Sequence, residues 1–220
     1  MRLLLAALGL IYLSGCAAPP LYSYAVYEDP TSFVRLDYSP DAQVDQPATL
    51  YSHPATLTTE QLTKIFQGLH VQEHRSSVVL WFMDEAEVMP AFTTKEVAFL
   101  AQHVGRALSQ AVSEEVVLFY MSTPLNSTNR EITSGSVFIK EQQFHVMLSN
   151  YRMMYSIPPF GIVYDRRHPA YSIAPRTVDL LFHPSDHTIP NVVSFLERVV
   201  GETHDGEIIL NLSHFSALRT

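Results

Sequence analysis

A long amphipathic helix between two continuous apolar runs is the feature that most limits how this chain can fold. The helix is predicted to begin at the capping box Thr93–Glu96, in which a hydroxyl and a glutamate three positions later bind free backbone donors. Apolar residues then recur on one face at helical spacing, namely Val97, Leu100, Ala101, Val104, Ala107, Leu108 and Ala111. The runs Val78–Met83 and Val116–Met121 are typical of strands that are buried on both faces. Together these segments predict a βαβ unit with both strands central in a sheet.

The rest of the pattern predicts further helices and strands around this unit. A second capping box, Thr58–Gln61, begins a helix that is expected to end near Gly68 and to bury Leu62, Ile65, Phe66 and Leu69. A third helix is expected from Pro190 to Val200. The predicted strands are Ser32–Tyr38 at an exposed edge, the hairpin of Ile132–Lys140 and Gln143–Asn150, and then Thr177–Phe182 and Glu207–Leu212. The sum is a single α/β or α+β domain with a mixed sheet and about three helices.

The start of the chain has the layout of a secretory signal peptide. Arg2 is followed by the uncharged run Leu3–Leu13, which is shorter than the roughly 20 apolar residues that cross a bilayer. The small residues Ser14 and Gly15 come next, and then Cys16, which is the only cysteine in the chain. The order Leu-Ser-Gly-Cys resembles the lipobox of bacterial lipoproteins.

This resemblance implies that the chain is cut between Gly15 and Cys16 and that Cys16 then carries fatty acyl chains. Two or three such chains would make the attachment permanent, since a single one binds a bilayer only reversibly. In Gram-negative members of the class, an aspartate after the cysteine tends to retain the protein at the inner membrane. Ala17 and Ala18 therefore imply the outer membrane, facing the periplasm. A plain signal peptide and a short buried helix are the alternatives.

The predicted domain organisation follows from these segments. Residues 1–15 are the signal peptide, residues 16–31 the lipidated N-terminus and a tether, and residues 32–220 one globular domain. The tether is indicated by prolines and tyrosines without steady periodicity over residues 17–31. A second stretch rich in proline and tyrosine, Tyr151–Pro175, predicts a long irregular excursion within the domain.

Composition and missing motifs narrow the function. A formal net charge of −8 makes nucleic acid a poor partner and argues against electrostatic docking of the domain onto anionic lipid. One cysteine permits no disulfide within the chain, so the 47% of hydrophobic residues must supply a stabilising core. The sequence has no G-x-S-x-G elbow and no glycine loop that would hold a phosphate. We therefore expect no cofactor and no catalytic residue.

Two groups of histidines are candidate metal ligands. His70, Glu73 and His74 have the H-x-x-E-H pattern of the inverted zinc metallopeptidases, which requires both imidazoles on one helical face. The simpler interpretation is ordinary surface histidines at a helix end, where the imidazole suits the helix dipole. His183 and His187 flank Asp186 in a loop and could bind a metal ion, a site that His168, His204 and His214 could complete. A solvated turn fits the same residues.

The arginines and tyrosines of the irregular stretch are the candidate contact region, because both residue types favour binding surfaces. They are Tyr151, Arg152, Tyr155, Tyr164, Arg166, Arg167, Tyr171 and Arg176. A loop held down by its own aromatic rings is the alternative interpretation. The sequence thus predicts a lipid-anchored envelope protein that binds an envelope protein partner, or a wall or surface component, without catalysis. The competing hypotheses are a zinc-dependent hydrolase and a structural subunit of a larger envelope complex.

Overall fold

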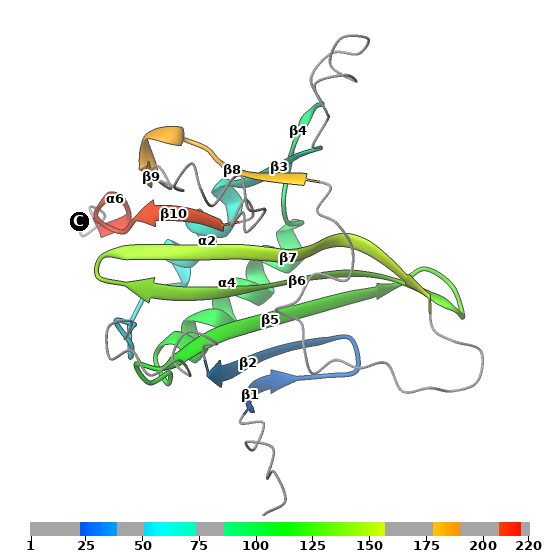
Figure 1. Ribbon diagram of the computed structural model, residues 1–220, viewed down its shortest axis with the longest axis horizontal. Helices are drawn as coiled ribbons and strands as arrows, with labels where there is room; N and C mark the ends of the chain where they lie inside the picture. The colour runs from blue at the N-terminus through cyan, green and yellow to red at the C-terminus, as the bar shows by residue number, and fades with distance from the viewer. Residues whose placement is uncertain (1–22, 39–50, 74–85, 157–177, 190–206, 217–220) are drawn as a thin grey trace, which may run out of the picture.

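A seven-stranded sheet forms the centre of the computed structural model, which describes residues 23–38, 51–73, 86–156, 178–189 and 207–216 (Figure 1). Its strands in sheet order are β1 (Ser23–Glu28), β2 (Ser32–Tyr38), β5 (Glu115–Pro124), β6 (Asn129–Lys140), β7 (Gln143–Ser156), β10 (Glu207–Asn211) and β9 (Thr188–Ile189). A smaller sheet has the order β4 (Val88–Pro90), β3 (Leu69–Glu73) and β8 (Val178–Phe182). Every pairing between described strands is antiparallel.

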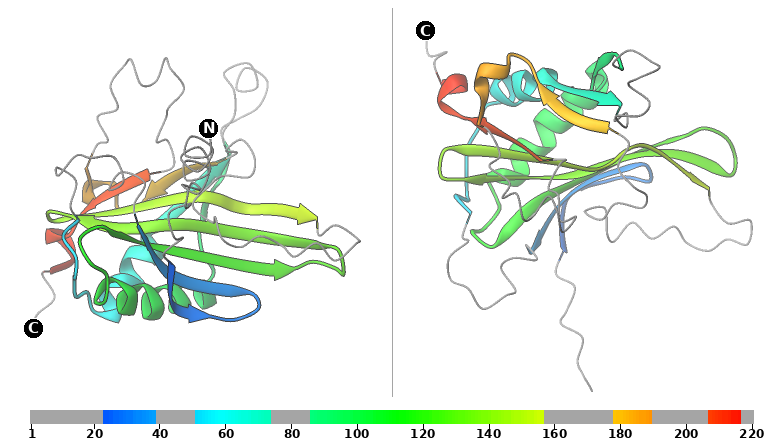
Figure 2. Two further views of the ribbon diagram at one scale, coloured as in Figure 1. Left: turned by 60° about the horizontal axis from the view of Figure 1, so that its bottom comes forward. Right: turned by 45° about the horizontal axis from the view of Figure 1, so that its top comes forward.

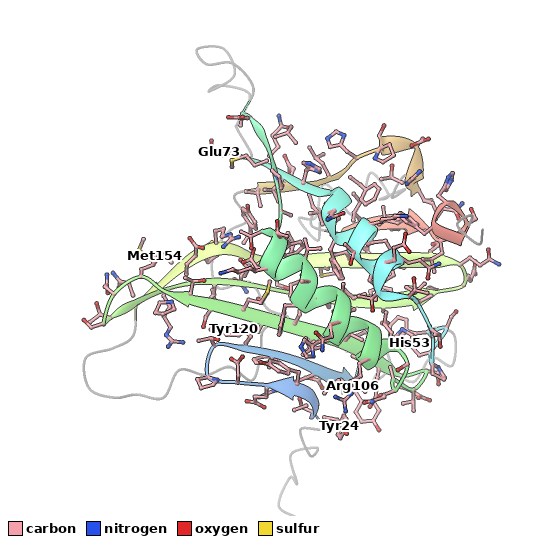
Figure 3. The ribbon with its side chains drawn as sticks, turned by 180° about the vertical axis from the view of Figure 1, so that it is seen from behind. Tyr24, His53, Glu73, Arg106, Tyr120 and Met154 are labelled. Carbon is pink, nitrogen blue, oxygen red and sulfur yellow. The ribbon has the colours of Figure 1, made fainter. Side chains whose placement is uncertain are left out.

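Three α-helices accompany the sheets in the described residues: α2 (Thr59–Gly68), α4 (Thr94–Leu108) and the short α6 (Ser213–Ser216). Helices α2 and α4 lie on the same face of the large sheet (Figures 2 and 3). A single 3₁₀ turn, η2 (Ser185–His187), joins β8 to β9. The expected single domain with about three helices is therefore confirmed, in its α+β form. Among these helices none is both long and apolar enough to cross a membrane.

The two predicted capping boxes are both present and both begin helices. Thr58 accepts a hydrogen bond from the backbone of Gln61, and Thr93 does the same for Glu96, while the Gln61 and Glu96 side chains return to the cap backbone. The apolar positions expected on each helix are buried, and Ala111 is buried although α4 already ends at Leu108. Burial of these side chains against the sheet is the main source of stability, because helices this short are marginal alone.

Strand β5 does not belong to the parallel βαβ unit that the sequence predicts around α4. Its two neighbours in the sheet are β2 and β6, and both run antiparallel to it; the run Val78–Met83 lies outside the described residues. The apolar sequence of β5 arises because both faces are covered. Val117 and Phe119 join the core under the helices, whereas Leu118 and Tyr120 belong to two smaller clusters of buried side chains. A continuous apolar run records burial but not strand direction.

The tether predicted up to residue 31 is wrong for its second half, since Ser23–Glu28 form strand β1. Because β2 pairs with β1 on one side and with β5 on the other, it is not the edge strand that its alternating pattern suggested. The hairpin turn depends on Asp29, whose carboxylate accepts hydrogen bonds from the backbone of Thr31 and Ser32 at 2.6 and 2.7 Å and from the Tyr27 hydroxyl at 2.7 Å. The sequence predicted a tether here because the turn between β1 and β2 contains a proline, as linkers do.

The irregular excursion predicted from Tyr151 is also wrong at its start, because β7 continues to Ser156, which pairs with Asn129 at the start of β6. The hairpin itself and the strands expected at Thr177–Phe182 and Glu207–Leu212 are confirmed, the latter two as β8 and β10. The helix expected at Pro190–Val200 lies outside the described residues. Helix α6 was not predicted, since a single turn is too short to show periodicity.

We expect Asp29→Ala to lower the free energy of unfolding by about 1–2 kcal/mol at neutral pH, because the variant loses the hydrogen bonds that close the β1–β2 turn. Partial burial opposes ionisation of Asp29, but hydrogen bonds from Tyr27, Thr31 and Ser32 outweigh it and lower its pKa from 3.8 to about 2. This stability is present above pH 3.8 and is lost as the pH falls through about 2.

Urea unfolding at neutral pH and again near pH 3 measures the effect, and the difference between wild type and variant should be smaller at the lower pH. Asp186→Ala is the matched control, because the Asp186 side chain is 74% exposed. An equal loss of stability at both pH values would contradict the role given to the Asp29 carboxylate.

Candidate functional site

The candidate site surrounds Arg152 on β7, and a change of register between β6 and β7 determines the position of this residue. The pairing is regular from Lys140 and Gln143 up to Gly135 and Leu148, and it then shifts twice, on either side of Ser134. Gly135 lies at this point without room for a side chain, since a Cβ there would collide with the Met147 carbonyl oxygen and lie 2.7 Å from the Phe119 ring.

The added length on β7 is absorbed by an unusual backbone conformation at Arg152, whose φ is 47°. Its backbone N–H donates to the Thr133 hydroxyl at 3.3 Å. Two residues earlier on β7, the buried Asn150 side chain donates to the Ser134 hydroxyl at 2.8 Å. These side-chain hydrogen bonds take over where the regular ladder is interrupted, so the bulge is held in one geometry.

The Arg152 guanidinium joins three separate elements through two carboxylates. Nη2 donates to Glu96 in the first turn of α4 at 2.7 Å, and Nη1 donates to Glu131 on β6 at 2.9 Å. Burial favours the neutral guanidine, but the hydrogen bond to Glu131 and the charges of both carboxylates outweigh it and raise the pKa of Arg152 above its usual value. Arg152 is therefore charged at every physiological pH.

Glu96 has two roles at once. The oxygen that accepts from Arg152 also accepts from the backbone N–H of Thr93 at 2.7 Å and from its hydroxyl at 2.8 Å. The capping box of α4 is thus continuous with the ion pairs of Arg152. A negative charge at this position also suits the positive end of the helix dipole. The N-terminus of α4 is consequently fixed to the β6–β7 hairpin.

A pocket of about 500 Å³ opens beside Arg152, a size within the usual range for ligand sites. Its lining comes from the end of α2, the end of β4, the start of α4 and β7, and consists of Gln67, Pro90, Phe92, Thr93, Thr94, Val97 and Arg152. Phe92 and Val97 are buried, whereas Gln67, Thr93 and Thr94 are exposed. The pocket therefore combines apolar surface with hydroxyl, amide and guanidinium groups that form hydrogen bonds.

The charges around the pocket decide which ligands suit it. Arg152 contributes one positive charge and its two partners contribute two negative charges at 2.7 and 2.9 Å. A phosphate or carboxylate ligand would compete with carboxylates that are already in place. A neutral chain with an apolar side chain and polar backbone groups, as in a polypeptide segment, fits this balance better.

The H-x-x-E-H motif does not lie on a helix, because α2 ends at Gly68 and β3 begins at Leu69. In a strand, residues three apart point to opposite faces, so Glu73 does not lie on the same face as His70, and the helical face that the zinc motif requires is not formed. His74 lies outside the described residues. The helix ends at Gly68, as the sequence predicts, but the residues that follow form a strand because β3 pairs with β4 and β8 in the smaller sheet.

The candidate histidines fall into two separate pairs. The rings of His70 and His183 meet edge to face with centroids 4.8 Å apart, and those of His187 and His214 stack at 4.7 Å. Asp186 Oδ1 lies 3.9 Å from His187 Nε2. Within the described ranges, no three His, Cys, Asp or Glu side chains gather closely enough to hold a metal ion together. His168 and His204 lie outside those ranges.

Only part of the predicted contact region is described. Tyr151 packs against the main core, Arg152 lies at the pocket, and Tyr155 belongs to β7. Tyr164, Arg166, Arg167, Tyr171 and Arg176 lie outside the described residues, as do the processing residues Gly15 and Cys16.

Sequence reasoning missed the two acidic partners of Arg152, although a signal for one of them exists. A regular hairpin that continued the register of Lys140 and Gln143 would place Glu131 directly opposite Arg152, as a cross-strand ion pair. Glu96 carried no such signal because it was assigned fully to the capping box. Also missed was a pair on the large sheet, in which the buried His145 and the partly buried Glu207 lie 2.7 Å apart.

No protein-family model, curated protein or solved structure matches this chain. The fold and the site together define an α+β domain whose long hairpin holds an arginine, paired with two carboxylates, beside a partly apolar pocket.

We expect Arg152→Gln to lower the free energy of unfolding by about 1–3 kcal/mol, because the variant leaves Glu96 and Glu131 close together without their shared cation. The positive φ at residue 152 is as unfavourable for glutamine as for arginine. The change in unfolding free energy therefore reports the lost ion pairs. Arg130→Gln, on the same hairpin, is the control and removes one hydrogen bond, to Ser122.

Urea unfolding of both variants and of Arg152→Gln combined with Glu131→Gln completes the measurement. The double variant should recover part of the loss, since it removes one of the repelling carboxylates. Equal stability of Arg152→Gln and Arg130→Gln would show that the three-element junction contributes nothing.

Proposed function

We propose that this protein is a lipid-anchored lipoprotein of the bacterial cell envelope whose domain binds a partner without catalysis. The observation that carries the proposal is the sole cysteine at the end of Leu13-Ser14-Gly15-Cys16, directly after a short apolar run. A domain whose stability comes from its core has no structural need for this cysteine. Placement at the outer membrane, facing the periplasm, is proposed from Ala17 and Ala18.

The start of the domain supports attachment close to the bilayer. Strand β1 begins at Ser23, and six residues, 17–22, separate it from Cys16. A chain of this length spans at most about 25 Å when fully extended. The distance is half of what the expected longer tether would allow, so the anchored domain stays at the membrane surface.

The pocket beside Arg152 supports a binding role. It combines the buried rings and methyl groups of Phe92 and Val97 with exposed polar groups of Gln67 and Thr94. Its charge balance suits a segment of an envelope protein better than an anionic small molecule. We therefore propose that the pocket is where the partner binds.

We expect Cys16→Ser to abolish acylation and either to release the protein from the membrane fraction or to leave the uncleaved precursor. The reason is that a hydroxyl cannot form the thioether that carries the lipid. Metabolic labelling with an alkyne fatty acid, fractionation and the mass of the mature N-terminus provide the measurement. A wild-type protein with a free Cys16 thiol would disprove the proposal, and Ser14→Ala, which keeps the cysteine, is the control.

We expect Gln67→Trp to reduce capture of the partner at least about tenfold, because the indole fills the pocket while the exposed position leaves the core intact. Gln102→Trp is the matched control, since Gln102 is exposed on α4 and does not line the pocket. Proteins that co-purify from solubilised envelopes are compared quantitatively for wild type and both variants. If every captured protein is retained equally by Gln67→Trp and Gln102→Trp, the pocket is not the binding site.

A further inference from the structure

We propose that one end of the domain, the tyrosine edge formed by Tyr24, Tyr38 and Val112, lies against the headgroup region of the bilayer that holds Cys16. The inference rests on the proposed lipid attachment and adds to it a fixed orientation of the domain. Its three side chains are 51%, 42% and 47% exposed, although each is large and apolar in most of its surface.

The strand register places these three residues together. Tyr24 pairs with Leu36, so Tyr38, two residues further along β2, is its diagonal neighbour on the same face. Tyr38 in turn pairs with Glu115 at the start of β5. Glu115 binds Val112 twice, from its backbone N–H to the Val112 carbonyl at 3.0 Å and from the Val112 N–H to its carboxylate at 2.9 Å. The edge is therefore one continuous surface.

The length of chain from the anchor selects the bilayer as the occupant of this surface. Tyr24 is the second residue of β1, and its Cα lies within about 30 Å of Cys16 along the chain, even when the connecting residues are fully extended. Among the described residues, only Ser23 lies nearer to Cys16 along the chain. A surface that is tied this closely to the acyl chains meets the headgroups before any other surface does.

The chemistry of the edge fits the interface between lipid and water. Tyrosine is enriched at that level of a membrane, because its ring is apolar and its hydroxyl forms hydrogen bonds. Asp37 and Glu114 are neighbours of these residues in the chain, so attraction to anionic lipid does not provide the contact. Burial of aromatic and apolar side chains provides the contact instead, so the contact is insensitive to salt.

Other exposed apolar residues lie too far away to share this contact. Strand β5 runs ten residues from Glu115, beside Tyr38, to Pro124, a length of roughly 33 Å. Leu125, which is 49% exposed, follows Pro124 at the far end. Met154 is also distant from Tyr24, as Figure 3 shows. Leu125 is therefore a matched control of similar exposure.

The test uses the full-length lipidated protein in vesicles of phosphatidylethanolamine and phosphatidylglycerol that contain a phospholipid with a nitroxide on its headgroup. Trp81, the single tryptophan of the sequence, is replaced by phenylalanine so that it does not contribute to the fluorescence. One new tryptophan is then introduced at a time. Tyr38→Trp and Val112→Trp are the reporters, and Leu125→Trp is the control. Two reporters are used so that the result does not depend on the folding of one variant. Flotation with the vesicles and the mass of the N-terminus are recorded first.

We expect the nitroxide to quench Tyr38→Trp and Val112→Trp at least about twofold more strongly than Leu125→Trp, at low and at high salt. Equal, weak quenching at all three positions in protein that floats and is acylated would overturn the orientation while the lipoprotein assignment stands. The edge would then be left for a protein partner. Protein that carries a bare cysteine and does not float would overturn both proposals.

Discussion

The interruption of the β6–β7 ladder at Gly135 is the constraint on which the rest of the site depends. Strands pair closely enough at this position that no Cβ fits between Phe119 and the Met147 carbonyl. The register shifts that follow place Arg152 in the left-handed region, with φ of 47°, where a residue other than glycine costs free energy. That cost is offset by the two ion pairs and by the hydrogen bond to Thr133. A regular hairpin would have paired Arg152 with Glu131 across the strands. In the observed geometry Arg152 also binds Glu96, which adds an ion pair to the packing of α4 on the sheet.

The junction that results also explains why the pocket is polar without being a site for anions. The part-buried guanidinium of Arg152 requires a negative charge nearby, and here the two carboxylates exceed its single positive charge. One of them, on Glu96, is already required by the helix cap. The same carboxylate binds Thr93 and Arg152, which both line the pocket, so the position of the pocket wall follows the position of the helix. Thr93 and Thr94 are held in place by the same bonds that begin the helix, so the pocket is pre-formed.

The elements that could be predicted are those with a strong local signal. Both capping boxes and the apolar faces behind them identified α2 and α4, and alternation over Ile132–Lys140 and Gln143–Asn150 identified the hairpin. The errors have one physical origin, which is that partners distant in sequence decide what a segment becomes. Ser23–Glu28 has linker composition but pairs with β2, and the H-x-x-E-H residues leave the helix because β4 and β8 pair with them. Arg152 was predicted as a contact residue by its type. Its partner Glu131 would have followed from the register of a regular hairpin, whereas Glu96 is distant in sequence and carried no such signal.

Helix α4 relates the two proposed surfaces to each other. Its N-terminal residue, Thr94, lines the pocket, and its C-terminal end leads through the turn at Val112 to the tyrosine edge. With fifteen residues at about 1.5 Å each, the helix separates the two surfaces by roughly 22 Å. The hairpin gives the same order, since Glu131 pairs near the far end of β5 while Tyr38 pairs with its first residue. If the tyrosine edge faces the headgroups, the pocket is held away from the membrane and open toward the aqueous side, where a partner from the periplasm can reach it. In the proposed arrangement, the lipid on Cys16 and the tyrosine edge together position the pocket relative to the bilayer.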